Sequence, residues 1–144
     1  MLRSVIYTSH AARGFTDEDL AEVLTVSRAN NIKWHLSGML LSRDGSFLQV
    51  LEGPVWPMAR TLARIEADPR HGQMTILCDQ QVEARVFGEW TMASDVLDAE
   101  GTVAMTTDAV RAHLERGASP EARVLIETFL RVTAAASAPL AAAG

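Results

Sequence analysis

The sequence predicts an α+β fold of the ferredoxin-like type, with two helices on one face of a mixed sheet and C-terminal helices on the opposite face. Three observations lead to this prediction. The element order is β-α-β-β-α-β-β, the Asp44-Gly45 pair indicates a tight hairpin, and the strand after it carries apolar residues on both faces. The last observation means that something must cover the second face of the sheet.

The first half of the chain supplies a strand, a helix and a hairpin. Leu2–Ser9 alternates and is rich in β-branched and aromatic residues, which is typical of a strand. Thr16 is placed to cap a helix with an acidic first turn, and this helix is expected to fade near residues 30–31. The apolar runs 37–43 and 46–51 then predict two antiparallel strands.

The next segment supplies the second helix and two more strands. Pro54–Asp68 has apolar residues at helical spacing, and Pro69 ends that helix because proline disfavours helical geometry in the residue before it. Met74–Cys78 and Arg85–Ser94 are expected to be strands.

The C-terminal third of the chain predicts two helices that cover the sheet. Leu48 and Val50 point away from the first helix layer and need such a cover. One short helix is expected to end at Gly117, and Ser119-Pro120 starts another with a wide apolar face. We therefore expect a sheet domain over residues 1–97 and a helical extension over 98–144, whose Ala-rich end frays after about residue 134.

Composition excludes several classes of protein. The chain has 144 residues, 13 basic and 18 acidic side chains and a net charge of −5, and its basic residues are scattered, which argues against direct nucleic-acid binding. No apolar run is long enough for a membrane span or a signal peptide. Cys78 is the single cysteine, so no internal disulfide forms and a cytoplasmic location is expected.

Two polar residues lie unexpectedly within apolar strands. Gln49 shares a strand face with apolar neighbours, and Tyr7 is expected on the same side of the sheet. A buried amide or phenol needs a hydrogen-bond partner. Each residue alone has an ordinary structural explanation, an amide bonded to backbone and a core tyrosine, but together they indicate a site.

The two helices add polar sets, each of which borders a branched apolar residue. These sets are Ser27, Asn30 and Asn31 beside Val23, and Arg64 and Asp68 beside Ile65. Taken separately, they are readily explained as helix caps and an exposed ion pair. Taken together, they predict a flat apolar slot with amides at its floor, which suits a planar heterocycle with a mixed donor and acceptor edge.

Six motifs then carry a resemblance to a known family. They are VIYTS, SRANN, LSGMLL, FLQVLEGP, ARIEADPRH and RVFGEWTM, in this order from about Leu2 to Ser94. Together they resemble the BLUF family of blue-light sensors that use flavin, in its short stand-alone form.

The resemblance implies a noncovalently bound flavin between the two helices, usually FAD, with FMN or riboflavin as alternatives. The residues that it places at the flavin are Val23, Ser27, Asn30, Asn31, Phe47, Gln49, Arg64, Ile65 and Asp68. It also implies that Tyr7 donates an electron and a proton, and that Gln49 changes its hydrogen bonds by rotation or tautomerisation. Trp90 and Met92 would relay the signal; two residues apart on a predicted strand, they are expected on the same face, and which of them faces the flavin stays open.

Several residues depart from the family pattern or lie outside it. Trp34 and His35 predict a differently shaped loop before the second strand, whereas Trp56 and His71 are expected to pack at the surface. Cys78 is expected to pack in the sheet rather than take part in chemistry.

The length of the chain leaves no room for an effector domain after the sheet, so the expected output is a downstream effector protein. The C-terminal helices would be the relay and could also form a homo-oligomer, as a dimer or a larger assembly. The protein is then a sensor and not an enzyme. One alternative is a cofactor-free ferredoxin-like interaction module; another is an enzyme acting on small acyl phosphates, for which Arg13-Gly14 supplies only a fragment of an anion cradle.

Overall fold

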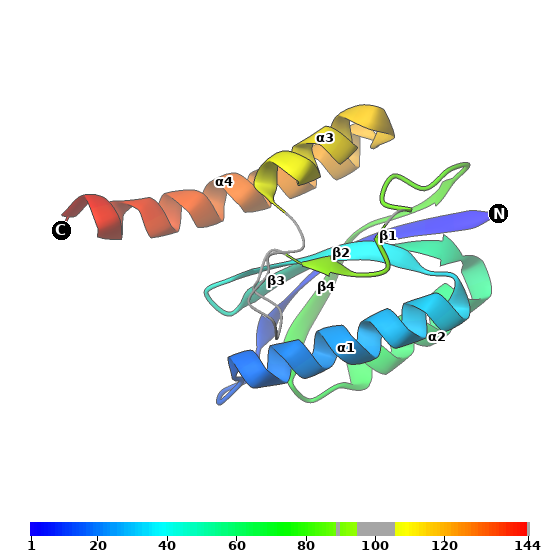
Figure 1. The fold of residues 1–144 in the computed structure, drawn as a ribbon, viewed down its shortest axis with the longest axis horizontal. Coiled ribbons are helices and arrows are strands. Elements are labelled where there is room, and N and C mark those ends of the chain that lie inside the picture. The colour runs from blue at the N-terminus through cyan, green and yellow to red at the C-terminus, as the bar shows by residue number, and fades with distance from the viewer. Residues whose placement is uncertain (89, 95–105, 144) are drawn as a thin grey trace.

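The computed structural model describes residues 1–88, 90–94 and 106–143, with the backbone alone for Ser94 and 133–143. Its elements are β1 (Leu2–Ala11), α1 (Asp17–Trp34), β2 (Ser37–Arg43), β3 (Ser46–Pro54), α2 (Val55–Ala67), β4 (His71–Val82), β5 (Ala93–Ser94), α3 (Thr107–Gly117) and α4 (Pro120–Ala143). The five strands form one sheet in the order β4-β1-β3-β2-β5. Helices α1 and α2 cover one face, and α3 and α4 lie over the other (Figure 1). The predicted ferredoxin-like α+β fold is confirmed.

The centre of the sheet fixes which side chains meet. β1 pairs antiparallel with β3 in a register that sets Tyr7 directly opposite Gln49. The hairpin between β2 and β3 turns at Asp44 and Gly45, whose φ angles of 49° and 81° are those of a type I′ turn. Because directly paired residues point to the same face, the phenol and the amide are neighbours.

Helix α1 is longer than the sequence suggested. Thr16 caps its start in a reciprocal capping box with Asp19, as expected. The helix does not fade near residues 30–31, because His35 takes the left-handed conformation and its N–H bonds back to the carbonyls of Asn31 and Ile32. Histidine thus terminates the helix where glycine is usual.

The predicted strand Arg85–Ser94 is reduced to the two residues of β5. The N–H groups of Val86 and Phe87 donate to the carboxylate of Glu52, and the N–H of Trp90 donates to the carbonyl of Phe87. These donors are therefore unavailable to a strand ladder. β4, in contrast, extends well beyond the predicted Met74–Cys78 and forms an edge of the sheet.

Each face of the sheet has its own core. On the face of α1 and α2, Val5, Leu51 and Met58 are fully buried. On the other face, α3 and α4 cover Leu48 and Val50, as the sequence required. The two cores separate the cavity described below from the C-terminal helices.

The first C-terminal helix ends at Gly117 and the second begins at Pro120, as predicted. Thr106 caps α3, and the hydroxyl of Ser119 accepts from the N–H of Ala122 at 3.2 Å at the start of α4. α4 continues to Ala143, past the point near residue 134 where fraying was expected. The expected domain boundary between residues 97 and 98 lies outside the described residues. Within the described part of the chain, no helix combines the length and apolar character that crossing a membrane requires.

Candidate functional site

A cavity of about 560 Å³ lies between α1 and α2 above the sheet, at the scale of a small-molecule site. Its lining residues are Tyr7, Ser9, Phe15, Leu20, Val23, Val26, Ser27, Leu40, Phe47, Gln49, Arg64, Ile65, Ala67, Asp68, Pro69, Arg70, His71 and Met92. Strands β1 to β3 supply the floor, and the two helices supply the walls. The cavity is mostly apolar, with a few polar groups that converge on its floor.

Three side chains form a hydrogen-bonded row across the floor. The Tyr7 hydroxyl donates to Oε1 of Gln49, and Nε2 of Gln49 donates to the sulfur of Met92 at 3.3 Å. All three side chains are buried. Because a thioether is a weak acceptor, the Gln49 amide group retains donor capacity for a stronger acceptor in the cavity.

Burial also controls the protonation of Tyr7. Removal from water, assisted by the negative charge of Asp68, raises the pKa of the phenol well above its ordinary value. Tyr7 is therefore a neutral hydrogen-bond donor at any physiological pH. Its proton leaves only if the phenol also loses an electron or gains a strong base.

Much of the cavity lining is apolar and offers flat surfaces. Val23 of α1 and Ile65 of α2 are half-buried and both line it. Phe47 packs edge-on against Phe15, with ring centroids 5.5 Å apart. These walls suit a planar, largely apolar ring.

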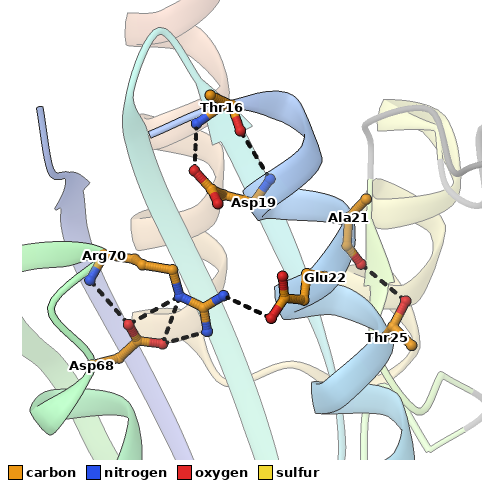
Figure 2. A network of polar contacts seen from close by, with 7 residues as sticks. All are labelled: Thr16, Asp19, Ala21, Glu22, Thr25, Asp68 and Arg70. Carbon is orange, nitrogen blue, oxygen red and sulfur yellow. Dashed lines mark hydrogen bonds and ion pairs between the residues drawn. The ribbon is translucent and has the colours of Figure 1, made fainter. Parts of the chain in front are cut away.

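Arg70 links the two helices at the edge of the cavity (Figure 2). It holds the carboxylate of Asp68, just after α2, with its Nη2 2.8 Å from Oδ2, and it lies 3.7 Å from the carboxylate of Glu22 on α1. The hydrogen bond from Arg70 lowers the pKa of Asp68 below its ordinary value. Asp68 is thus paired with Arg70 and not with Arg64, the partner that helical spacing indicated.

Most of the predicted site residues line this one cavity. They are Tyr7, Val23, Ser27, Phe47, Gln49, Arg64, Ile65, Asp68 and Met92. Asn30 and Asn31 are not among the lining residues, and the buried Asn31 amide donates instead to the carbonyl of Thr91. Asn31 therefore ties α1 to the segment that carries Met92.

Trp90 and Met92 do not share a face, contrary to the prediction. Met92 belongs to the core beneath α1 and α2, whereas Trp90 packs against the core beneath α3 and α4. The prediction assumed a regular strand, but β5 begins only at Ala93, so Trp90 and Met92 precede it and alternation does not apply to them. Met92 is consequently the residue that contacts Gln49.

Sequence reasoning missed several lining residues. His71 was expected at the surface, yet it lines the cavity and its Nε2 lies 2.6 Å from the carbonyl of Ile65. Alternation along the strand indicates that Ser9 shares the face of Tyr7, but Ser9 was not predicted to line the site. Phe15 lies in a loop, where no periodicity could have revealed its position.

The fold and the cavity define a ligand-binding α+β domain. The family model described as "Sensors of blue-light using FAD" matches residues 2–93, and the chain belongs to this family, BLUF. Members of this family bind FAD, and a BLUF domain senses light without being catalytic itself.

Individual relatives agree with this membership. The chain is 33% identical over 94 residues to the photoactivated adenylate cyclase subunit beta of Euglena gracilis, covering 65% of this chain and 11% of that protein. It is 32% identical over 90 residues to the blue light- and temperature-regulated antirepressor BluF of Escherichia coli strain K12, covering 62% of this chain and 22% of the relative. The chain thus spans a small part of the length of these curated relatives.

Solved structures show the same fold. The dark state of BlrB, a BLUF protein, superposes with a TM-score of 0.64 at 27% identity, covering 78% of this chain and 84% of that one. BlrP1 of Klebsiella pneumoniae, in a manganese and cyclic diGMP complex, reaches a TM-score of 0.73 at 25% identity, covering 91% of this chain and 33% of that one.

The residues of the cavity fit a flavin. A ring system with carbonyl acceptors needs donors at one edge and apolar contacts on its faces. The Gln49 amide supplies the donor, and Val23 and Ile65 supply apolar walls. The cofactor of the family and the chemistry of this cavity therefore agree.

Proposed function

We propose that this chain is a blue-light photoreceptor in which Tyr7 and Gln49 form the switch. The observation that carries the proposal is the buried row from the Tyr7 hydroxyl through the Gln49 amide to the Met92 sulfur, on the floor of a cavity that fits the family's cofactor. When bound and excited by blue light, the flavin supplies an electron acceptor beside this row.

Tyr7 is the donor of an electron and its phenolic proton in this proposal. Its hydroxyl already donates to Gln49, so the amide provides a short path for the proton. Gln49 then exchanges the ends that it presents to Tyr7 and Met92, by rotation or tautomerisation, because an amide has a donor end and an acceptor end of similar shape. The electron and the proton then return to Tyr7, so that the altered hydrogen bonds around Gln49 alone are the stored signal.

We assign the remaining residues by their place around the cavity. Val23, Phe47 and Ile65 would contact the faces of the ring, whereas Ser27, Arg64 and Asp68 would contact its polar edge or side chain. The resemblance to the family places Asn30 and Asn31 at the polar edge of the flavin, and Asn31 also ties its helix to Thr91. Met92 would report the state of Gln49, and Trp90 would pass the change to α3.

We further propose that the output passes through a helical extension, residues 98–144, to a separate effector protein. The sensor domain would then be residues 1–97, in the cytoplasm, and the extension could also join two or more copies. Support comes from α3 and α4, which lie on the sheet face opposite the cavity. The relatives named above include an adenylate cyclase and an antirepressor, so one family serves different outputs.

An absorption spectrum in darkness and after blue illumination tests the proposal. Oxidised-flavin bands that shift slightly to the red on illumination and recover in the dark are expected. A protein that stays colourless after FAD, FMN or riboflavin is added would contradict the proposal. That result would favour the cofactor-free interaction module instead.

A further inference from the structure

The segment from Arg85 to Met92 has contacts on both faces of the sheet. At its end, Met92 receives the hydrogen bond from Gln49. On the other face, the rings of Phe87 and Trp90 pack on His113 of α3, with centroid distances of 5.7 Å and 3.9 Å. One short stretch of chain therefore touches both the cavity floor and the C-terminal helices.

The start of this segment is held by a buried carboxylate. Glu52 is 1% exposed, and its two oxygens accept from the N–H groups of Val86 and Phe87 at 2.7 Å and 2.6 Å. Glu52 lies on β3, three residues after Gln49, and faces the opposite side of the sheet. The strand that carries the proposed switch thus also carries the anchor of the segment.

Arg85, at the start of the segment, adds hydrogen bonds to the neighbouring strands. Its Nη1 donates to the Ser37 hydroxyl at 2.8 Å and to the backbone carbonyl of Glu52 at 3.0 Å, and its Nη2 donates to the carbonyl of His35. The segment is therefore tied to both β2 and β3 before it turns. Charged hydrogen bonds of this kind are stronger and more directional than neutral ones.

A carboxylate is a costly way to fill this position. Burial raises the pKa of Glu52, and the two backbone hydrogen bonds oppose that shift. An apolar side chain of similar size would avoid the cost of removing a charge from water. It could not, however, accept from two successive N–H groups, so the carboxylate specifically fixes the path of the backbone.

We propose that Glu52 is a positioning residue that fixes the start of this segment, so that a change at Gln49 and Met92 is transmitted through Trp90 to His113. This inference rests on the proposed photoreceptor function. A segment free at its start would absorb a displacement of Met92 by shifting as a whole. With its start fixed, the same displacement must change how Trp90 packs on His113.

The test compares dark and illuminated amide hydrogen exchange in α3 for the full flavin-loaded chain and for Glu52→Gln. Glutamine keeps the shape but presents one N–H₂ group to a backbone N–H, so one hydrogen bond is lost. The flavin red shift should remain, while the light-dark difference in α3 should fall about fivefold or more, the population change that loss of about 1 kcal/mol produces.

Asp79→Asn is the matched control. Both Asp79 oxygens accept from Arg3, and this exposed pair joins β1 to the edge strand β4 rather than to the segment. The control removes a carboxylate without altering the anchor. Its red shift and its α3 response should equal those of the unsubstituted chain.

The other possible outcomes of this hydrogen-exchange comparison would contradict either the photoreceptor function or the role of Glu52. An unsubstituted chain without a red shift contradicts the photoreceptor function itself. A red shift with no α3 response in the unsubstituted chain, or an undiminished response in Glu52→Gln, overturns the positioning role alone. Should Glu52→Gln fail to fold, Arg85→Gln removes the second set of contacts from a more exposed position, and an undiminished α3 response there overturns the role as well.

Discussion

At the residue scale, the buried phenol of Tyr7 has a property that can be measured without light. Tyr7 is the chain's single tyrosine, so any tyrosinate signal belongs to it. Burial raises its pKa, and the folded state therefore favours the neutral phenol. We expect no tyrosinate absorbance in the folded protein at pH values where the urea-unfolded chain titrates, near about 10.

The sign of the accompanying stability change follows from this shift. A pKa raised on folding means that the native state binds more protons than the unfolded state above about pH 10. The stabilisation that the neutral Tyr7 phenol contributes is therefore fully present below the pKa of the unfolded chain. It declines as the pH rises from the unfolded pKa towards the raised pKa of the folded protein. A folded protein that titrates like the unfolded chain would show that Tyr7 is exposed to water.

Substitutions of Tyr7 and Gln49 should separate the roles of the two residues. Gln49→Leu removes both hydrogen bonds of the row and should abolish the red shift while flavin remains bound. Tyr7→Phe removes only the hydroxyl and should stop the photocycle without loss of colour. Absorption spectra before and after illumination measure both effects, and Val124→Ala, an exposed position on α4, is the control. A Tyr7→Phe variant that photocycles normally would contradict the mechanism.

At the element scale, the end of α1 offers a local test of strain. His35 has φ 58° and is exposed, in a conformation that glycine adopts at lower cost. His35→Gly should stabilise the fold by about 0.5 kcal/mol, because relief of strain exceeds the added entropy of the unfolded chain. Urea denaturation measures the change. Lys33→Gly, inside the last helical turn, should instead destabilise by about 1 kcal/mol, and equal effects would contradict the argument.

The same elements show what the sequence could predict. Local signals identified the hairpin at Asp44 and Gly45 and the helix start at Thr16, because turns and caps depend on neighbouring residues. The path of Val86 and Phe87 depends on Glu52, more than thirty residues away in the chain. No local pattern indicates such a contact.

In the candidate site too, some positions followed from local patterns and others did not. Alternation placed Tyr7 and Gln49 on one face, and the structure sets them opposite each other. Trp90 and Met92 were assigned a shared face from the same rule, which failed because both residues precede the strand β5. Periodicity predicts side-chain direction only inside a regular element.

At the scale of the whole molecule, the sheet separates two layers with different tasks. One face carries the cavity. The other is covered by α3 and α4 (Figure 1). β3 contributes to both, with Gln49 toward the cavity and Val50 toward the C-terminal helices. Removal of one layer should therefore leave the local geometry of the other in place.

Truncation after Ser94 tests this separation. It would expose five side chains that are now at most 2% exposed, namely Ile6, Met39, Leu41, Leu48 and Val50. Each costs about 1.5–3 kcal/mol to return to water, so the bare face should aggregate or bind another copy. Flavin colour should persist because the cavity residues belong to the other face. Light scattering and absorption measure the two effects, and a coloured, monodisperse fragment would show that the sheet needs no cover.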